Sequence, residues 1–420
     1  MNFNTISVIG LGYIGLPTAA AFTLSRKQVI GVDINQDAVD TINRGTINLI
    51  ESDLSKVVKI AVQQGLLHAV CRPQPADAFL IAVPTPLSEG YQPDISYVRT
   101  AVLSLVPVLK SGDLVILEST SPVGTTEQMA GLLAWARPDL TFPQQVGEAA
   151  DINMAYCPER VLPSKAMLEL IKNDRVIGGM TPRCSARAAD LYRIFVEGEC
   201  IITDVRTAEM CKLTENSFRD VNIAFANELS LICDQQQINI WELIALANRH
   251  PRVKILQPGP GVGGHCIAVD PWFIVAQNSV HARLIRTARQ VNDDQPSWVV
   301  NKVKAAVADF LTYSGRKIST VTIACFGLAF KQDIDDLRDS PAVQVTQMIS
   351  TWHCGPILVV EPNIRILPES LVGQVTLTDS DQALATADVL VMLVDHRQFL
   401  ALKPSSIAQR WIIDTKGVWR

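Results

Sequence analysis

The sequence has no excess of positive charge, no regular cysteine framework and no long apolar run. Its formal net charge of −5 at pH 7 provides no basic field for nucleic acid. The nine cysteines include no Cys-x-x-Cys pair and their number is odd, which favours thiols in a reducing compartment over disulfides or a zinc site. No apolar run is long enough to span a bilayer, and the first residues lack the segments of a signal peptide. We therefore expect a cytoplasmic enzyme without a bound metal.

Apolar strands alternate with helical stretches at both ends of the chain. A chain of 420 residues is long enough for two or three domains. The N-terminal part contains "TISVIGLGYIGLP", "QVIGVDIN", "ADAFLIAVPT" and "GDLVILESTS", and the C-terminal part "TVTIACFGLAFK", "GPILVVEPN" and "ATADVLVMLVDH". Between them the pattern is helical in period. We predict an α/β protein with two Rossmann-like parallel sheets joined by a helical central domain. The predicted domains are residues 1–200, 201–312 and 313–420.

A glycine fingerprint lies between the first strand and the first helix, as Gly10-x-Gly12-x-x-Gly15. Gly10 allows the tight turn, Gly12 lets the backbone approach a pyrophosphate, and Gly15 permits close packing of helix on strand. The helix N-terminus then offers N–H groups to the phosphates. Asp33 ends the next strand, where it would accept from ribose hydroxyls and repel a 2′-phosphate. The pattern predicts NAD rather than NADP. Glu361 ends a comparable strand in the second sheet, which lacks the glycine fingerprint.

Polar side chains follow the third and fourth strands and lie on the central helix. Thr85 and Thr126 fall at the carboxyl ends of strands, where doubly wound sheets bind ligands; they contact ribose or pyrophosphate, or they are ordinary strand-to-helix turns. Lys212, Asn216 and Arg219 are spaced to share one helix face, which is either part of a site or simply solvated.

Glycines and prolines surround Cys266 in "PGPGVGGHCIAVDP", residues 258–271. This composition predicts backbone wrapped around a ligand. A cysteine is nucleophilic as a thiolate, which requires cationic neighbours such as Lys212 or His265; the alternative is a small buried hydrophobe. Thiolate attack on an aldehyde gives a thiohemiacetal that can lose a hydride and become a thioester. NAD together with a nucleophilic cysteine therefore predicts oxidation of an aldehyde, or of an alcohol through it.

Taken in order, "GLGYIGLP", "VPTP", "STSPVGTT", "CPER", "CKLTENSFR", "GPGVGGHCIAVDP" and "FGLAFKQDIDDLRDSP" resemble the UDP-glucose/GDP-mannose dehydrogenase superfamily over essentially the whole chain. The resemblance implies two successive oxidations at C6 of a UDP-sugar, consuming two NAD and one water. In detail, "NRHPRVKILQPGPGVGGHCIAVDPWFIVAQ" and "DTKGVWR" resemble members that convert UDP-N-acetyl-D-mannosamine to UDP-N-acetyl-D-mannosaminuronate, a precursor of enterobacterial common antigen.

The same resemblance implies roles for individual residues. Cys266 would be the nucleophile and Lys212 the acid/base, Asn216 would help to hold the oxygen, and Glu159 and Asp270 would assist water and proton traffic. The implied cofactor contacts are Gly10, Gly12, Tyr13, Ile14, Gly15, Asp33, Thr85, Thr126 and Arg338. The implied substrate contacts are Arg160, Val161, Lys212, Asn216, Arg219, His250, Arg252, Gly263, Phe330, Lys331 and Lys416.

Further expectations concern assembly and local structure. The family's central domain forms a homodimer, in which His250 or Arg252 reaches the neighbouring subunit's site. Arg338 either lies near the cofactor or pairs with a neighbouring aspartate. Ser164 stands where a glycine often follows the "CPER" motif, which bears on the shape of that loop.

Three alternatives remain at this point. A UDP-glucose or UDP-N-acetylglucosamine 6-dehydrogenase would share the same machinery. A single-hydride β-hydroxyacid dehydrogenase would have no use for Cys266. A non-catalytic nucleotide-sugar-binding protein would have no reason to keep both Lys212 and Cys266.

Overall fold

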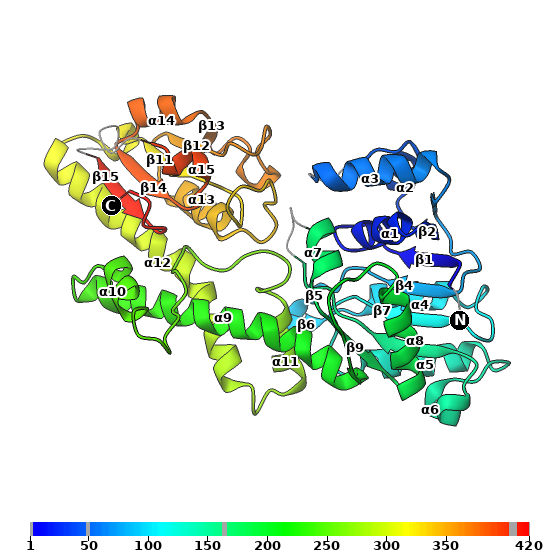
Figure 1. Ribbon diagram of the computed structural model, residues 1–420. Coiled ribbons are helices and arrows are strands. Elements are labelled where there is room, and N and C mark those ends of the chain that lie inside the picture. Colours follow the sequence, from blue (N-terminus) through cyan, green and yellow to red (C-terminus); the bar gives the residue numbers. More distant parts are fainter. Residues whose placement is uncertain (1–2, 48–50, 162–165, 403–409, 420) are drawn as a thin grey trace. The chain divides into compact units, whose positions relative to one another are not determined.

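The computed structural model describes residues 3–47, 51–161, 166–402 and 410–419 (Figure 1). The chain forms two compact units, Met1–Glu215 and Asn216–Arg420. The boundary between them falls inside one long helix, α9 (Val205–Gln235).

The first unit is built on an eight-stranded sheet with the order β10-β9-β8-β7-β4-β1-β2-β3. From β3 to β8 this is the 3-2-1-4-5-6 order of a dinucleotide-binding sheet. All neighbouring strands are parallel except β8 and β9, which run antiparallel, so the expected Rossmann-like sheet is confirmed but is not parallel throughout. Its strands are β1 (Thr5–Ile9), β2 (Gln28–Val32), β3 (Leu67–Val70), β4 (Ala78–Ile81), β7 (Leu114–Leu117), β8 (Asn153–Tyr156), β9 (Arg175–Gly179) and β10 (Cys200–Asp204). A separate antiparallel hairpin joins β5 (Leu87–Ser88) and β6 (Gln92–Pro93).

Helices cover both faces of this sheet because successive strand residues point to opposite sides. Ile6 and Val8 pack in one cluster with apolar residues of α1, α3, α7 and α8, whereas Phe79 and Ile81 pack in the other with α4 and α5. The helices are α1 (Gly15–Leu24), α2 (Gln36–Asn43), α3 (Ser52–Gln63), α4 (Ser96–Ser104), α5 (Thr125–Ala136), α6 (Pro143–Val146), α7 (Ala166–Lys172) and α8 (Pro182–Tyr192).

The described stretch 205–322 contains helices and no strand, which confirms the predicted helical central region. After α9 come α10 (Ile240–Ala247), α11 (Asp270–Gln277) and α12 (Arg283–Ser314). Arg289 of α12 lies fully buried against Asp220 of α9, with 2.6 Å between Nη1 and Oδ1. Arg289 also pairs with Asp293, whereas Asp220 would lose its cation if Arg289 were removed, so the buried pair favours this packing of the two helices.

The second sheet has the order β13-β12-β11-β14-β15, with every neighbouring pair parallel. The turn after β11 repeats the turn after β1: Gly10 (φ +92°) donates to Val32 O at 2.8 Å, and Gly327 (φ +96°) to Val360 O at 2.8 Å. The predicted second Rossmann-like sheet is thereby confirmed. Its elements are β11 (Ile323–Phe326), α13 (Pro341–Trp352), β12 (Ile357–Val360), β13 (Thr376–Leu377), α14 (Ser380–Thr386), β14 (Val389–Met392), α15 (Arg397–Leu400) and β15 (Trp411–Asp414). Among the described helices of both units, none is long and apolar enough to cross a membrane.

Candidate active site

The glycine turn after β1 has the shape of a dinucleotide cradle. A Cβ atom at Gly10 would lie 2.4 Å from Ala82 O, and one at Gly15 would lie 1.8 Å from Gly10 O, so both positions require glycine. At Gly12 a Cβ would meet no heavy atom within 4 Å, and this open side is where a pyrophosphate would approach. The turn therefore fits the predicted cofactor.

Asp33 forms hydrogen bonds with the backbone of the turn. Its Oδ2 accepts from Leu11 N at 2.9 Å and its Oδ1 from Asn35 N at 2.9 Å. A carboxylate held from both sides keeps its remaining lone pairs in fixed directions, as a ribose contact requires.

Thr126 differs from Thr85 in its surroundings. Thr85 is half-buried, whereas Thr126 is fully buried at the start of α5. The Thr126 hydroxyl donates to Glu209 Oε1 at 2.7 Å, and the same carboxylate accepts from the backbone N–H groups of Thr126 and Gly124. This geometry favours a role for Thr126 in holding α9 to α5, and its direct contact with the cofactor stays a prediction.

Lys212 and the segment after β8 lie together in the first unit. Lys212 Nζ donates to the backbone carbonyl of Glu159 at 2.8 Å. Arg160, the next residue, forms an ion pair with Glu215 of α9 at 2.7 Å. Lys212 and Glu159, two predicted catalytic residues, are therefore brought into contact. Val161 is half-buried, and Ser164 lies outside the described residues.

Glu159 forms an ion pair with a buried arginine. Arg175, at the start of β9, lies 2.9 Å from Glu159 Oε2, and both side chains are 4% exposed. The guanidinium stacks over Tyr192 with 5.0 Å to the ring centroid, and Tyr192 donates to Glu118 at 2.6 Å. Burial raises the pKa of Glu118 to about 7, against the opposing attraction of Arg175.

The cysteine loop of the second unit is anchored by hydrogen bonds and close packing. Gly259 N donates to Asn227 Oδ1 of α9 at 2.9 Å. A Cβ at Gly263 would lie 2.3 Å from Asp339 O, and one at Gly264 would lie 2.8 Å from the ring of Phe330. These two glycines therefore admit another segment of the same chain, and contact of the loop's backbone with a ligand stays a prediction.

Cys266 precedes a pair of buried polar side chains. Cys266 is half-buried, and its carbonyl accepts from Asp270 N at 2.8 Å. The Asp270 carboxylate is 2% exposed and accepts from Asn216 Nδ2 at 2.5 Å. Cys266, Asp270 and Asn216 are therefore connected within the second unit, and their predicted catalytic roles stay predictions.

The other predicted site residues have varied surroundings. Lys416 forms an ion pair with Asp395 at 3.3 Å, and its Nζ lies 3.7 Å from where a Cβ of Gly259 would be. Arg338 pairs with Asp336 at 2.6 Å, the pairing that the sequence left open as an alternative to a cofactor contact. The remaining residues range from half-buried to exposed, and they are Tyr13, Ile14, Arg219, His250, Arg252 and Lys331.

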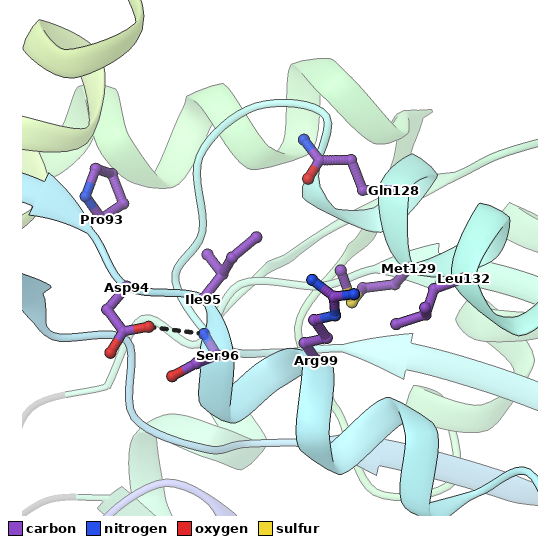
Figure 2. Close-up of a pocket in the computed structure, with 8 residues that line it drawn as sticks. All are labelled: Pro93, Asp94, Ile95, Ser96, Arg99, Gln128, Met129 and Leu132. Carbon is purple, nitrogen blue, oxygen red and sulfur yellow. Dashed lines mark hydrogen bonds between the residues drawn. The ribbon is translucent and has the colours of Figure 1, made fainter.

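The first unit contains a cavity of about 520 Å³ (Figure 2). It is lined by β6, the segment leading into α4, and residues of α4 and α5. Asp94 caps the start of α4 there by accepting from Ser96 N at 2.8 Å. None of the predicted cofactor, substrate or catalytic residues lines this cavity, so we do not assign the chemistry to it.

Comparison with known families matches all three parts of the chain. The models of the UDP-glucose/GDP-mannose dehydrogenase family match as the NAD binding domain over residues 4–196, the central domain over 206–294 and the UDP binding domain over 324–420. The chain belongs to the UDP-glucose/GDP-mannose dehydrogenase family. The predicted family, its enzymatic class and its cofactor NAD are thereby confirmed.

Individual relatives of this dehydrogenase cover its full length. It is 72% identical over 420 residues to the UDP-N-acetyl-D-mannosamine dehydrogenase of Yersinia pestis, covering 100% of both chains. It is 59% identical to an NDP-N-acetyl-D-galactosaminuronic acid dehydrogenase of Ralstonia nicotianae, covering 100% of this chain and 97% of the relative. The solved UDP-D-ManNAc dehydrogenase of Pyrococcus horikoshii superposes with a TM-score of 0.89 at 38% identity, covering 99% and 96% of the two chains.

Four residues of this dehydrogenase position the predicted site residues and were not predicted from the sequence. Arg175 holds Glu159, Glu209 caps α5, Asn227 anchors the cysteine loop, and Glu215 pairs with Arg160. Glu209 and Glu215 each lie three residues from Lys212 on α9, and that spacing was the available signal. Arg175 opens an apolar strand, and nothing in its local sequence indicates that it is buried with a partner.

Proposed function

We propose that this protein oxidises UDP-N-acetyl-D-mannosamine at C6 to UDP-N-acetyl-D-mannosaminuronate, with two NAD reduced and one water consumed. The observation that best supports this proposal is that Asp270, the first residue of α11, is bonded to both Cys266 and Asn216, which lies on α9. Its backbone N–H donates to the Cys266 carbonyl at 2.8 Å, and its carboxylate accepts from Asn216 Nδ2 at 2.5 Å. Relatives that bear the mannosamine name support the choice of sugar.

The proposed chemistry proceeds in three stages on the sugar. The turn of Gly10, Gly12 and Gly15 would hold NAD, which would supply the hydride acceptor for each of the two oxidations at C6. Lys212 takes the proton from the C6 hydroxyl as the aldehyde forms and stabilises the oxygen's negative charge, with Asn216 as a second donor. The Cys266 thiolate then attacks the aldehyde carbon, and loss of the second hydride leaves a thioester.

Water closes the cycle by cleaving the bond between sulfur and C6. Glu159 and Asp270 are the proposed acceptors of its proton. Glu159 is suited to this role because Arg175, 2.9 Å from its Oε2, holds the carboxylate in a fixed position. The thiol leaves as a thiolate and the product is a carboxylate, so two hydrides and one water balance the conversion of alcohol to acid.

The proposed contacts also account for binding of a diphosphate by an acidic protein. The net charge is −5, so positive charge must be local. We propose that it is supplied by Arg160, Arg219, Arg252, Lys331 and Lys416. The proposed division of labour assigns NAD to residues 1–200, Lys212 and Cys266 to 201–312, and the UDP-sugar to 313–420.

The stoichiometry of NADH tests the function directly. NADH formed per mole of sugar should be measured with UDP-N-acetylmannosamine, UDP-glucose and UDP-N-acetylglucosamine in parallel. Two NADH, with the highest kcat/KM for the mannosamine, is the expected result. One NADH per sugar would contradict the thioester route, and two NADH with another preferred sugar would contradict only the substrate.

A Cys266→Ala variant separates chemistry from binding. It should form no acid and should bind NAD as the parent does, because the NAD turn lies in the other unit. Acid formation at the parent rate would refute the covalent mechanism.

We further propose a homodimer that works in the cytoplasm. α9 carries Phe218, Phe225 and Ile232 at intervals of seven residues, with exposed fractions of 67%, 51% and 43%. Residues seven apart lie on one side of a helix, and a continuous apolar stripe of this kind is typical of helix–helix association. Sedimentation should give a dimer for the parent and a monomer for Phe218→Glu combined with Phe225→Glu.

A further inference from the structure

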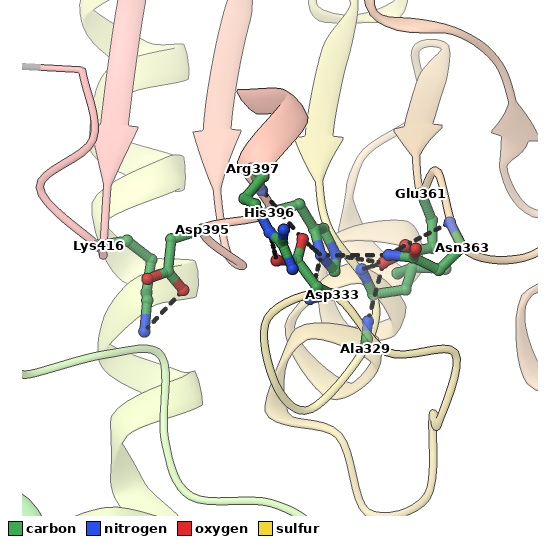
Figure 3. A network of polar contacts seen from close by, with 9 residues as sticks. Ala329, Asp333, Glu361, Asn363, Asp395, His396, Arg397 and Lys416 are labelled. Atoms are coloured by element: carbon green, nitrogen blue, oxygen red, sulfur yellow. Dashed lines mark hydrogen bonds and ion pairs between the residues drawn. The ribbon is translucent and has the colours of Figure 1, made fainter. Parts of the chain in front are cut away.

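The carboxyl edge of the second sheet holds a buried network that no catalytic step uses. Figure 3 shows its side chains gathered beyond the tips of the strands. At its centre, His396 Nε2 lies 2.9 Å from Glu361 Oε2, and both side chains have no exposed surface. His396 follows β14 and Glu361 follows β12.

The hydrogen bonds around His396 fix its tautomer. Its Nδ1 accepts from the backbone N–H of Asp333 at 2.9 Å, so Nδ1 acts as a hydrogen-bond acceptor. Nε2 therefore carries the proton and donates it to Glu361. His396 thus links the Glu361 carboxylate to the backbone at Asp333.

These bonds clamp one turn at both of its ends. At its start, Glu361 Oε2 accepts from Leu328 N at 2.7 Å and from Ala329 N at 3.0 Å. At its end, Asp333 has a left-handed backbone (φ +58°). Its N–H is held by His396, and its carboxylate accepts from Arg397 Nε at 2.6 Å. Residues 328–333 are therefore held by side chains from two other strand ends.

The clamped turn carries the ring that packs against the cysteine loop. Phe330 lies between the two clamped ends, and its ring fills the space where Gly264 would carry a Cβ, 2.8 Å away. Gly264 is two residues before Cys266. A shift of the turn would therefore move the backbone that presents the thiol.

We propose that His396 is a positioning residue for Cys266, acting through Glu361, Asp333 and the ring of Phe330. Its importance for turnover rests on the proposed role of Cys266 as the nucleophile. The mechanical link to the cysteine loop does not depend on that role.

The test compares two buried histidines in the same unit. His396→Asn removes the Nε2 donor to Glu361. His353→Asn removes the equivalent Nε2 donor to Val321 O, a 2.8 Å bond at the opposite edge of the same sheet. His353 is 6% exposed and serves as the matched control. His396→Gln retains a donor close to the Nε2 position and should lie between the parent and His396→Asn.

The measured quantity is the rate at which iodoacetamide alkylates Cys266 in the full-length protein. Peptide mass spectrometry monitors this rate, and Cys71 of the first unit is the internal reference. We expect His396→Asn to raise the Cys266 rate at least threefold and to lower kcat about tenfold, with little change in the KM for NAD. His353→Asn should lower thermal stability and leave both values at the parent level.

Two failures are distinguishable in this design. An unchanged Cys266 alkylation rate in His396→Asn, or an equal change in His353→Asn, would overturn the positioning role. Full turnover by Cys266→Ala would overturn the covalent mechanism while leaving the alkylation result to report on the loop.

Discussion

The buried carboxyl of Glu118 predicts a specific loss of stability as pH rises. Burial raises its pKa to about 7, with Arg175 opposing the shift and Glu159 reinforcing it; the neighbouring groups Tyr192 and Cys157 are themselves held protonated by burial. An ordinary glutamate has a pKa of 4.5. The folded state therefore holds this proton more tightly, and the stability it contributes is complete below pH 4.5 and is lost as pH rises through 7.

The size of the effect follows from these two pKa values. Between pH 5.5 and 8.5 the parent should lose about 2 kcal/mol through Glu118 alone. A Glu118→Gln variant has no such proton, while its amide oxygen can still accept from Tyr192. Between pH 5.5 and 8.5, the free energy of unfolding of the variant relative to that of the parent should therefore rise by about 2 kcal/mol. For a unit of this size, that corresponds to about 4–8 °C in Tm.

Scanning calorimetry at both pH values measures this gap, since pH effects common to both proteins cancel. Glu148→Gln, at an exposed position of the same unit, is the control and should show no change in the gap. A gap for Glu118→Gln that is the same at pH 5.5 and 8.5 would refute the reasoning.

Three further predictions concern the cofactor turn, the residue behind Glu159 and the cysteine loop. Arg175→Met should cost about 3–5 kcal/mol of stability because it leaves Glu159 buried without its cation; a loss below 1 kcal/mol by urea unfolding would contradict that pairing. Gly264→Ala (φ +81°, a ring 2.8 Å away) should cost about 1–3 kcal/mol more than Gly112→Ala (φ +95°, nothing within 4 Å), and equal losses in Tm would mean that ring contact is unimportant. Asp33→Ala should shift the kcat/KM ratio of NADP to NAD upward about tenfold, and an unmoved ratio would reject Asp33 as the ribose ligand.

The sequence predicted the two sheets because apolar runs that alternate with helical stretches indicate parallel strands joined by helices. The glycine turn could also be predicted from the sequence. A Cβ atom at Gly10 or Gly15 would clash with backbone atoms that lie only a few residues or one strand away. The antiparallel β9 was not predicted, because an apolar run of five residues such as Arg175–Gly179 carries no information about its direction. Strand direction depends on which neighbour it joins.

Short motifs indicated candidate residues for the site, and their roles stay predictions. Among them, the structure connects Cys266, Asp270 and Asn216 by hydrogen bonds. Contacts between segments far apart in the sequence could not be predicted from the sequence alone. The ring of Phe330 packs against Gly264, 66 residues away in the sequence, and composition gave no sign of this contact.

The carboxylate at the end of β12 limits what the second sheet can become. Asp33 and Glu361 occupy equivalent places after a turn that begins with a left-handed glycine. Glu361, however, accepts from two turn amides, from Asn363 and from a buried imidazole. A protein engineer who restored the missing glycines near Gly327 would still lack a free acid for a ribose. Converting this sheet into a second dinucleotide site would require replacing His396 as well, at the cost of the turn that it holds.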